Sequence, residues 1–403
     1  MNQHLAIDGG TPVRNEAWPS WPQFDAAQRA VVDRVLESGR VNYWTGGEGR
    51  ALEREFAAYC GVPHAVALMN GTVALEAALA ALGVGAGDEV IVPARTFIAS
   101  ASAVVARGAV PVICDVDADS QTLTADTVAP LVGPRTRCII AVHLAGWPCP
   151  MDELMQLSNA HGLGVIEDCA QAHGATLSGR AVGSLGHVAA FSFCQDKIMT
   201  TGGEGGMLTT RDEAVWRHVW SLKDHGKDHD AVHAPHDGNG FRWLHHDFGT
   251  NWRMTEMQAA IGRVQLDLLP DWLDTRRRHA AALDAGLADC AALRLASPPP
   301  EVGHARYKYY AFLRPETLKN GWDRDRVLAA INAEGVPAQS GSCSEIYLEQ
   351  AFARRGFGPA ARLPVARRLG ETSLMLQVHP TLDEIAIDAA VRAVRKVLKA
   401  ATR

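Results

Sequence analysis

The sequence predicts an α/β protein with a mostly parallel sheet sandwiched by helices, followed by a smaller C-terminal α+β domain. Short apolar runs alternate with helical patterns between residues 25 and 222, and this alternation is typical of parallel sheets. The chain has 403 residues, 47% of them hydrophobic, so it is longer than one compact domain usually grows. We expect an N-terminal arm over 1–24, a large domain over 25–253 and a small domain over 254–403.

Helices and strands of the large domain are expected from periodicity and from end signals. Asp25 can cap the first helix and Gly39 can end it, while Gly61 can end the second. The expected helices cover residues 25–38, 51–59, 74–82, 98–106 and 152–160. The expected strands cover residues 64–69, 89–92, 110–114, 138–142, 164–167 and 188–193. Ligands bind beyond the carboxyl ends of strands in such sheets, so we expect the site in the segments that follow them.

A long polar segment, residues 223–250, interrupts this alternation and is expected to be a functional loop. Four of its six histidines lie at spacings of four, four and three residues, namely His225, His229, His233 and His236. This spacing suits a metal only on a helix, and Gly226, Pro235 and Gly238 argue against a helix. We therefore expect no metal site in this segment.

The last third of the chain predicts the smaller α+β domain. A helical pattern from Thr255 to Leu269 is expected to break at Pro270 and to resume over residues 271–285. Further elements are expected with loops between them, namely a strand over 307–313 and helices near 324–333 and 382–400.

Composition and charge argue against several classes of protein. The formal net charge is −6, the isoelectric point is near 6.2, and no basic block is visible, so nucleic acid is not an expected partner. No apolar run is long enough to span a membrane, and the N-terminal residues lack a signal-peptide pattern, so we expect a cytoplasmic protein. The eight cysteines form no C-x-x-C pair and are expected to be free thiols.

Lys197 is the first of only seven lysines and follows the apolar run at 189–193. The glycines between residues 202 and 206 come shortly after it. An amine that condenses with an aldehyde must be held on rigid structure, beside backbone that can approach a flat ligand closely. Lys197 is therefore a candidate Schiff-base lysine, although a solvated surface charge is the alternative interpretation.

A Schiff-base cofactor such as pyridoxal phosphate also needs an anion for its ring nitrogen and contacts to its ring. Asp168 follows an apolar strand-like run and can supply the anion, although aspartate is also a common helix cap. Gln171 can lie against the ring hydroxyl or cap the next segment. Phe97 can stack on the ring, or it can be an ordinary core aromatic.

A phosphate group needs hydrogen-bond donors, and the sequence offers two candidate sources. Gly71 and Thr72 open a predicted helix, where backbone N–H groups and the helix dipole attract anions. The alternative is a simple turn followed by a capped helix. Ser192 can add a hydroxyl, although a buried serine also bonds to local backbone.

Four motifs, taken together and in this order, carry a resemblance to a known family. They are Asn-Gly-Thr at 70–72, Thr-Phe at 96–97, Glu-Asp-Cys-Ala-Gln-Ala-His-Gly at 167–174, and the segment 192–206 around Lys197. The sequence resembles the DegT/DnrJ/EryC1/StrS family of fold-type I, pyridoxal-phosphate-dependent sugar and cyclitol aminotransferases. The resemblance runs over nearly the whole chain.

The resemblance implies a role for each matching residue. Lys197 resembles the lysine that binds the cofactor aldehyde, and Asp168 resembles the partner of the ring nitrogen. The other cofactor contacts implied are Gly71, Thr72 and Ser192 for the phosphate, Phe97 for stacking and Gln171 for the ring's oxygen side. Asn251 resembles an asparagine that reaches the phosphate in the neighbouring subunit, which implies a homodimer with shared active sites.

The family implies a ping-pong transfer of an amino group from glutamate or glutamine to a keto-sugar, carried by a nucleotide, in amino-sugar biosynthesis. Residues 341–348 and 5–14 look closer to the cyclitol and aminohydroxybenzoate branches, so an aminocyclitol aminotransferase or aminohydroxybenzoate-type synthase is the alternative. Members that act as sugar dehydratases carry histidine in place of the lysine, and Lys197 argues against that activity. A non-catalytic regulatory role is disfavoured because the set of site residues is complete.

Overall fold

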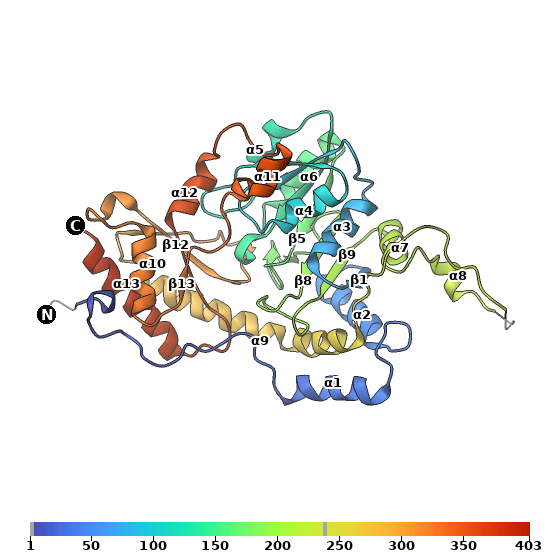
Figure 1. The fold of residues 1–403 in the computed structure, drawn as a ribbon, viewed down its shortest axis with the longest axis horizontal. Coiled ribbons are helices and arrows are strands. Elements are labelled where there is room, and N and C mark those ends of the chain that lie inside the picture. Colours follow the sequence, from blue (N-terminus) through green and yellow to red (C-terminus); the bar gives the residue numbers. More distant parts are fainter. Residues whose placement is uncertain (1–3, 237–239) are drawn as a thin grey trace.

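The computed structural model describes residues 4–236 and 240–403 (Figure 1). Residues 237–239, which include Gly238 of the expected loop, lie outside this description. A seven-stranded sheet forms the centre of the large domain, with the order β1-β9-β8-β5-β4-β2-β3. Its strands are β1 (His64–Leu68), β2 (Glu89–Pro93), β3 (Val110–Cys114), β4 (Thr136–Val142), β5 (Gly164–Asp168), β8 (Val188–Ser192) and β9 (Gly206–Thr210).

The sheet is parallel from β3 to β8, as the sequence predicted. The exception is β9, which pairs antiparallel with both β1 and β8. This strand was not predicted from the sequence, because its five residues follow directly on the glycine cluster and no helical pattern separates them from β8. The antiparallel strand places the glycines at 202–206 next to the end of β8, which is where Lys197 follows.

Helices cover both faces of this sheet, as expected (Figure 1). They are α1 (Ala26–Ser38), α2 (Glu48–Cys60), α3 (Gly71–Ala81), α4 (Ala99–Ala106), α5 (Ala125–Val128), α6 (Met151–His161) and α7 (Glu213–Leu222). One core contains side chains of α2 and α6, and the other contains side chains of α3, α4 and α7. Along β4, Ile139 belongs to the first core and Ile140 to the second, because successive side chains of a strand point to opposite faces.

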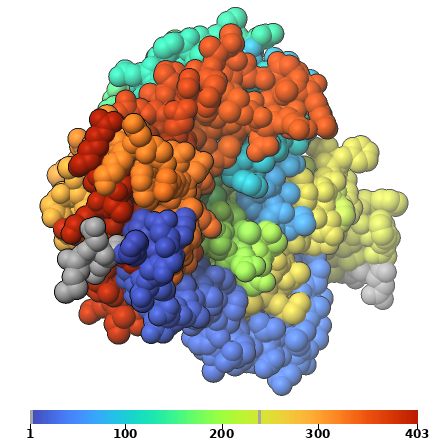
Figure 2. Space-filling view, turned by 60° about the vertical axis from the view of Figure 1, so that its left-hand side comes forward, coloured from blue at the N-terminus to red at the C-terminus, as the bar shows by residue number. Residues whose placement is uncertain are grey.

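The smaller sheet has four antiparallel strands in the order β10-β12-β14-β13. Its elements and their helices are β10 (Leu293–Leu295), β12 (Tyr309–Leu313), β13 (Ala338–Gln339), β14 (Ser373–Leu376), α10 (Arg324–Ala333) and α13 (Glu384–Ala401). Leu5 of the N-terminal arm is buried in the core of this domain. Figure 2 shows the arm, in dark blue, lying against the orange and red surface of the small domain.

Two further groups of elements connect the domains. A three-stranded sheet joins β6 (Thr176–Leu177) and β7 (Arg180–Ala181) to β11 (Val302–Gly303). The segment between β13 and β14 returns to the large domain through α11 (Gln350–Arg355) and α12 (Pro364–Thr372). Ile346, Tyr347 and Phe352 of this segment are buried in the core on the α3 side of the large sheet.

Helix α9 (Glu256–Leu287) runs without interruption through Pro270, so the expected break at this proline is wrong. Leu266, Leu269 and Leu273 pack into a core of the large domain, whereas Leu283 and Leu287 pack into the small domain. Pro270 itself is exposed. A proline inside a helix removes one backbone hydrogen bond and strains one turn. We attribute the continuity of α9 to the burial of leucine side chains before and after Pro270.

The segment 223–250 contains a short helix, α8 (His229–His233), that the sequence analysis did not expect. Asp228 caps it by accepting a hydrogen bond from the backbone N–H of Ala231. The imidazole rings of His229 and His233 lie 4.3 Å apart between centroids.

No helix among the described residues is long and apolar enough to cross a membrane.

Glu256, the first residue of α9, also caps the N-terminus of α2, which gives a test of the packing between these two helices. Its carboxylate is 1% exposed and accepts hydrogen bonds from the backbone N–H groups of Glu48 and Gly49, the latter at 3.0 Å. We expect Glu256→Ala to lower the free energy of unfolding by about 1–3 kcal/mol, because two buried donors lose their acceptor. Chemical denaturation measures this loss. Glu301→Ala, at an exposed position, is the control, and an equal effect of both variants would contradict the capping role.

Candidate active site

A cavity of about 670 Å³ opens where the large sheet, the small domain and the segment after β13 meet. It lies at the carboxyl ends of β1, β5 and β8. Seven of the eight site residues predicted from the sequence line this cavity, namely Gly71, Thr72, Phe97, Asp168, Gln171, Ser192 and Lys197. Its volume is in the range of small-molecule sites, roughly 300–1,000 Å³.

Lys197 lies half-buried in the loop that follows β8. Its backbone N–H donates to the carbonyl of Cys194 at 3.1 Å, and its own carbonyl accepts from the indole Nε1 of Trp21 at 2.8 Å. Its Nζ lies 5.4 Å from the centroid of the Tyr307 ring. The backbone of the lysine is thus fixed on both sides while its amine reaches into the cavity.

Asp168 ends β5 and is 6% exposed. It accepts hydrogen bonds from Ser100 Oγ at 3.0 Å and from the backbone N–H of Ala170 at 3.1 Å. No cationic side chain among residues 4–236 and 240–403 forms an ion pair with it. Burial raises the pKa of this carboxyl, although the two hydrogen bonds and the charge of Lys197 oppose the shift. A buried carboxylate without an ion pair fits a cationic N–H group of a ligand.

The N-terminus of α3 meets the ends of β8 and β9 at very close range. A Cβ atom on Gly71 would lie 2.6 Å from Cβ of Ser192, and one on Gly206 would lie 2.4 Å from the backbone carbonyl of Asn70. Only glycine fits at both positions. Asn70 caps the helix by accepting from the N–H of Val73. The earlier N–H groups of the helix therefore lack intrahelical partners and can bind an anion.

Phe97 and Gln171 present two different chemical surfaces to the cavity. Phe97 is 68% exposed although it is a large aromatic residue, so its ring is free to cover a flat ligand. Gln171 is buried, and its Oε1 accepts a hydrogen bond from the backbone N–H of Ala145 at 2.8 Å. With the oxygen engaged, the side-chain NH₂ group remains as a donor.

Asn251 does not line the cavity of its own chain. It is exposed and forms an isolated antiparallel bridge with Asp224. Large apolar side chains are exposed in the segment before it, namely Phe241 at 77%, Trp243 at 85% and Phe248 at 97%. A single chain therefore leaves this predicted site residue apart from the other seven.

Several lining residues come from the small domain and were not singled out in the sequence. They are Tyr307, Lys308, Tyr310, Gln339, Ser342 and Cys343. Tyr307 donates its hydroxyl proton to the carboxylate of Asp196, the residue before Lys197. The sequence predicted the strand at 307–313, but nothing local in it indicates which side chains face the other domain. Trp21 of the N-terminal arm was missed for the same reason.

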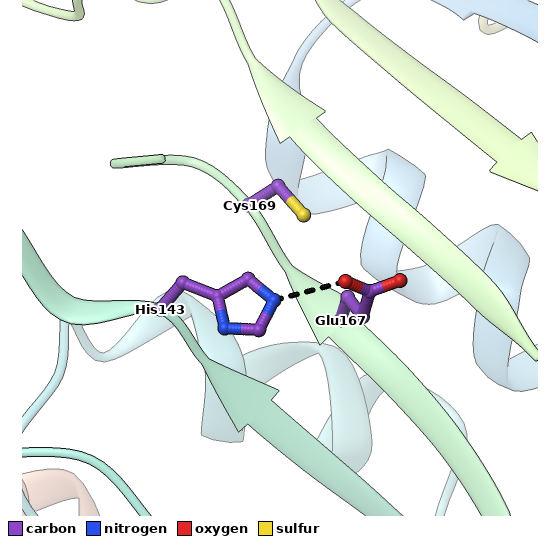
Figure 3. A group of neighbouring side chains, drawn as sticks. All are labelled: His143, Glu167 and Cys169. Carbon is purple, nitrogen blue, oxygen red and sulfur yellow. Dashed lines mark hydrogen bonds and ion pairs between the residues drawn. The ribbon is translucent and has the colours of Figure 1, made fainter. Parts of the chain in front are cut away.

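His143 and Glu167 form a fully buried pair behind the cavity (Figure 3). The Nδ1 atom of His143 accepts from the N–H of Cys149, so the proton is assigned to Nε2, which donates to Glu167 at 3.0 Å. Burial by itself raises the pKa of Glu167, but His143 and backbone N–H groups lower it below its ordinary value. The backbone N–H of His143 also donates to the carbonyl of Asp168 at 3.1 Å. The pair therefore supports the strand end that carries Asp168.

Cys169 lies beside this pair, and the three side chains are spaced closely enough to suggest a metal site. Both ring nitrogens of His143 are already hydrogen bonded. Both carboxylate oxygens of Glu167 accept backbone N–H groups, including those of Gly183 and Gly186. Burial raises the pKa of the Cys169 thiol well above its ordinary value. The cluster is satisfied without an ion.

The donor set of the cavity fits pyridoxal phosphate in four respects. A reactive amine and an unpaired buried carboxylate line one cavity, and a glycine-walled helix N-terminus lines the same cavity. An exposed aromatic ring completes it. No part of this set requires a metal ion.

Comparison with known proteins agrees with this geometry. The model of the DegT/DnrJ/EryC1/StrS aminotransferase family matches residues 22–395. An L-glutamine:2-deoxy-scyllo-inosose aminotransferase from Streptomyces kanamyceticus is 38% identical, over 84% of this chain and 80% of the relative. A dTDP-3-amino-3,4,6-trideoxy-alpha-D-glucose transaminase from Streptomyces venezuelae is 36% identical, over 94% and 93%.

The crystal structure of an aminotransferase from Psychrobacter cryohalolentis superposes with a TM-score of 0.94 at 51% identity, covering 95% of this chain and 99% of that one. The match extends over the large domain, the small domain and the segments that join them. The chain belongs to the DegT/DnrJ/EryC1/StrS aminotransferase family and is a pyridoxal-phosphate-dependent aminotransferase of fold type I.

Proposed function

We propose that this aminotransferase moves an amino group from glutamate or glutamine to a ketone on a nucleotide-linked sugar. The observation that carries the proposal is the presence of Lys197, Asp168 and the N-terminus of α3 in one cavity. The Streptomyces venezuelae relative, which by its name acts on a dTDP-sugar, supports the sugar substrate. An aminocyclitol is the second candidate, and the relatives named for 2-deoxy-scyllo-inosose support it.

Each of the seven predicted site residues in the cavity has a proposed role toward the cofactor. Gly71, Thr72 and Ser192 hold the phosphate, since helix N–H groups and hydroxyls meet there. Phe97 covers one face of the ring, and the NH₂ group of Gln171 donates to the ring oxygen. When bound, pyridoxal phosphate supplies an aldehyde for amines and a ring that delocalises the electron pair left by a broken C–H bond.

Lys197 and Asp168 are the residues proposed for proton transfer and for stabilising the protonated ring nitrogen. Asp168 holds the proton on the ring nitrogen, because its buried negative charge stabilises a cationic N–H partner. With pyridoxal phosphate bound, Lys197 would hold its aldehyde, and Nζ of Lys197 would be the base that moves a proton between the substrate carbon and the cofactor. The same Nζ would move a proton in the opposite direction for the ketone, as a ping-pong transfer requires.

We further propose that two copies of the chain share their active sites through Asn251. This side chain is exposed and outside its own cavity, and Phe241, Trp243 and Phe248 are exposed just before it. Exposed aromatic groups of this size are typical of surfaces that another chain covers. Asn251 would then donate to the phosphate held by the partner's helix α3.

The first test is the absorbance spectrum of the purified protein with pyridoxal phosphate, before and after adding glutamate or glutamine. We expect a visible band that one donor converts to an ultraviolet band, and we expect Lys197→Ala to lack the visible band. Lys399→Ala, which removes an exposed lysine on α13, should behave as the wild type. A visible band that neither donor changes would overturn the proposed donor, and an unaltered spectrum of Lys197→Ala would overturn the role of this lysine.

Asp168→Asn tests the proposed partner of the ring nitrogen. Asparagine keeps the shape but loses the negative charge, so the cofactor should still bind while the donor converts it roughly a hundredfold or more slowly. Stopped-flow absorbance in a single turnover measures this rate. Asp152→Asn, an exposed carboxylate on α6, is the matched control. A rate within about twofold of the wild type would exclude the proposed role.

Mixed dimers test whether Asn251 acts across the subunit boundary. Lys197→Ala and Asn251→Ala homodimers should each be strongly impaired. A dimer with one chain of each kind would contain one site with both residues intact, so mixing and refolding the two variants should restore activity. Activity that stays at the level of the separate variants would place Asn251 in the site of its own chain, or outside the site altogether.

A further inference from the structure

Lys308 supplies the second cationic side chain of the cavity wall. It directly precedes β12, and its side chain is 20% exposed. The charged side chains that line the cavity in the described part of the chain are Asp168, Asp196, Lys197, Glu204 and Lys308. Once Lys197 is committed to the cofactor, Lys308 is the remaining cation among these lining residues.

The ammonium group of Lys308 is only partly compensated. Its Nζ lies 3.9 Å from Oδ2 of Asp196 and 4.7 Å from the centroid of the Tyr307 ring. Oδ2 of Asp196 already accepts the hydroxyl proton of Tyr307. Within residues 4–236 and 240–403, no hydrogen bond from Nζ of Lys308 is present. This leaves N–H donors at the cavity surface, where an anionic ligand group can accept them.

The position of Lys308 restricts which anionic group it can meet. Nζ of Lys308 and Nζ of Lys197 lie 4.7 Å and 5.4 Å from the centroid of the same Tyr307 ring. Both ammonium groups therefore border the same ring, and Asp196, which lies 3.9 Å from Lys308, directly precedes Lys197, so an anion bound by Lys308 would lie in the part of the cavity that holds Lys197. The α-carboxylate of an amino acid is bonded to the reacting carbon, whereas the diphosphate of a nucleotide-linked sugar is several bonds away from any ring ketone.

We propose that Lys308 binds the α-carboxylate of the amino-acid donor, an inference that rests on the proposed transamination. A compact ammonium charge on a flexible stem suits a single carboxylate. The neighbouring lining groups Tyr310, Gln339 and Ser342 are neutral and suit the hydroxyls of a sugar or cyclitol. One cavity can thus receive a charged amino acid and then the hydroxyl-bearing ring of the ketone substrate.

The test titrates the holoenzyme with α-methylglutamate, or with α-methylglutamine where glutamine is the donor. These analogues lack the proton that Lys197 removes, so the spectral change of the bound cofactor reports binding alone. The comparison ligands, 4-amino-4-methylpentanoate and 4-amino-4-methylpentanamide, carry a methyl group in place of the α-carboxylate and also lack a removable proton on the amine-bearing carbon. We compare Lys308→Met, Lys308→Arg and, as the matched control, Lys399→Met. The visible band and the melting temperature of each variant establish that the fold and the cofactor site are intact.

We expect Lys308→Met to weaken binding of the α-methyl analogue by roughly tenfold to a hundredfold. Binding of the ligand without the α-carboxylate should stay within about twofold, Lys308→Arg should recover most of the loss, and Lys399→Met should match the wild type. An equal loss for both ligands, or none for either, would overturn the inference. If the wild type forms the visible band but no donor or analogue changes it, the proposed function fails and this inference fails with it.

Discussion

The burial of one helix in two cores holds the two walls of the active site together. Helix α9 packs into the large domain through Leu266 and Leu269 and into the small domain through Leu283 and Leu287. Arg276 on this helix is 1% exposed and donates to the backbone carbonyl of Tyr307 at 3.1 Å. A change in the course of α9 would therefore move the wall that carries Tyr307 relative to the sheet that carries Lys197.

Arg276 also connects α9 to the loop of the catalytic lysine. Its guanidinium lies 5.3 Å from the centroid of Trp21, which donates to the backbone carbonyl of Lys197. Burial lowers the pKa of Arg276 to about 10, so it remains a cation at neutral pH. A cation and an indole ring attract each other most strongly where water is excluded. The arm, the long helix and the lysine loop form one connected group of contacts.

Sequence patterns predicted most of the large domain because its signals are local. The cap at Asp25 and the left-handed glycine at Gly39 lie where they were expected, as do the polar segments at the strand ends. Alternation along the strand also predicts that Glu167 and Asp168 face opposite sides, but the structure is needed to tell which of them faces the cavity. Glu167 faces the side with His143 and four hydrogen bonds, whereas Asp168 faces the cavity.

The missed features depend on contacts between distant segments. Pro270 predicted a break that burial on both sides of the helix overrides, and β9 forms only because β1 and β8 flank it. Lys308 reaches the cavity and Trp21 reaches the backbone of Lys197 through the packing of distant segments, which no local pattern reports. The contact proposed for Asn251 is the hardest to predict from local patterns, because its partner belongs to another copy of the chain. If two copies share their sites as proposed, a phosphate cradle completed by the partner subunit would couple cofactor retention to assembly, and the exposed aromatic side chains just before Asn251 would be covered in that assembly.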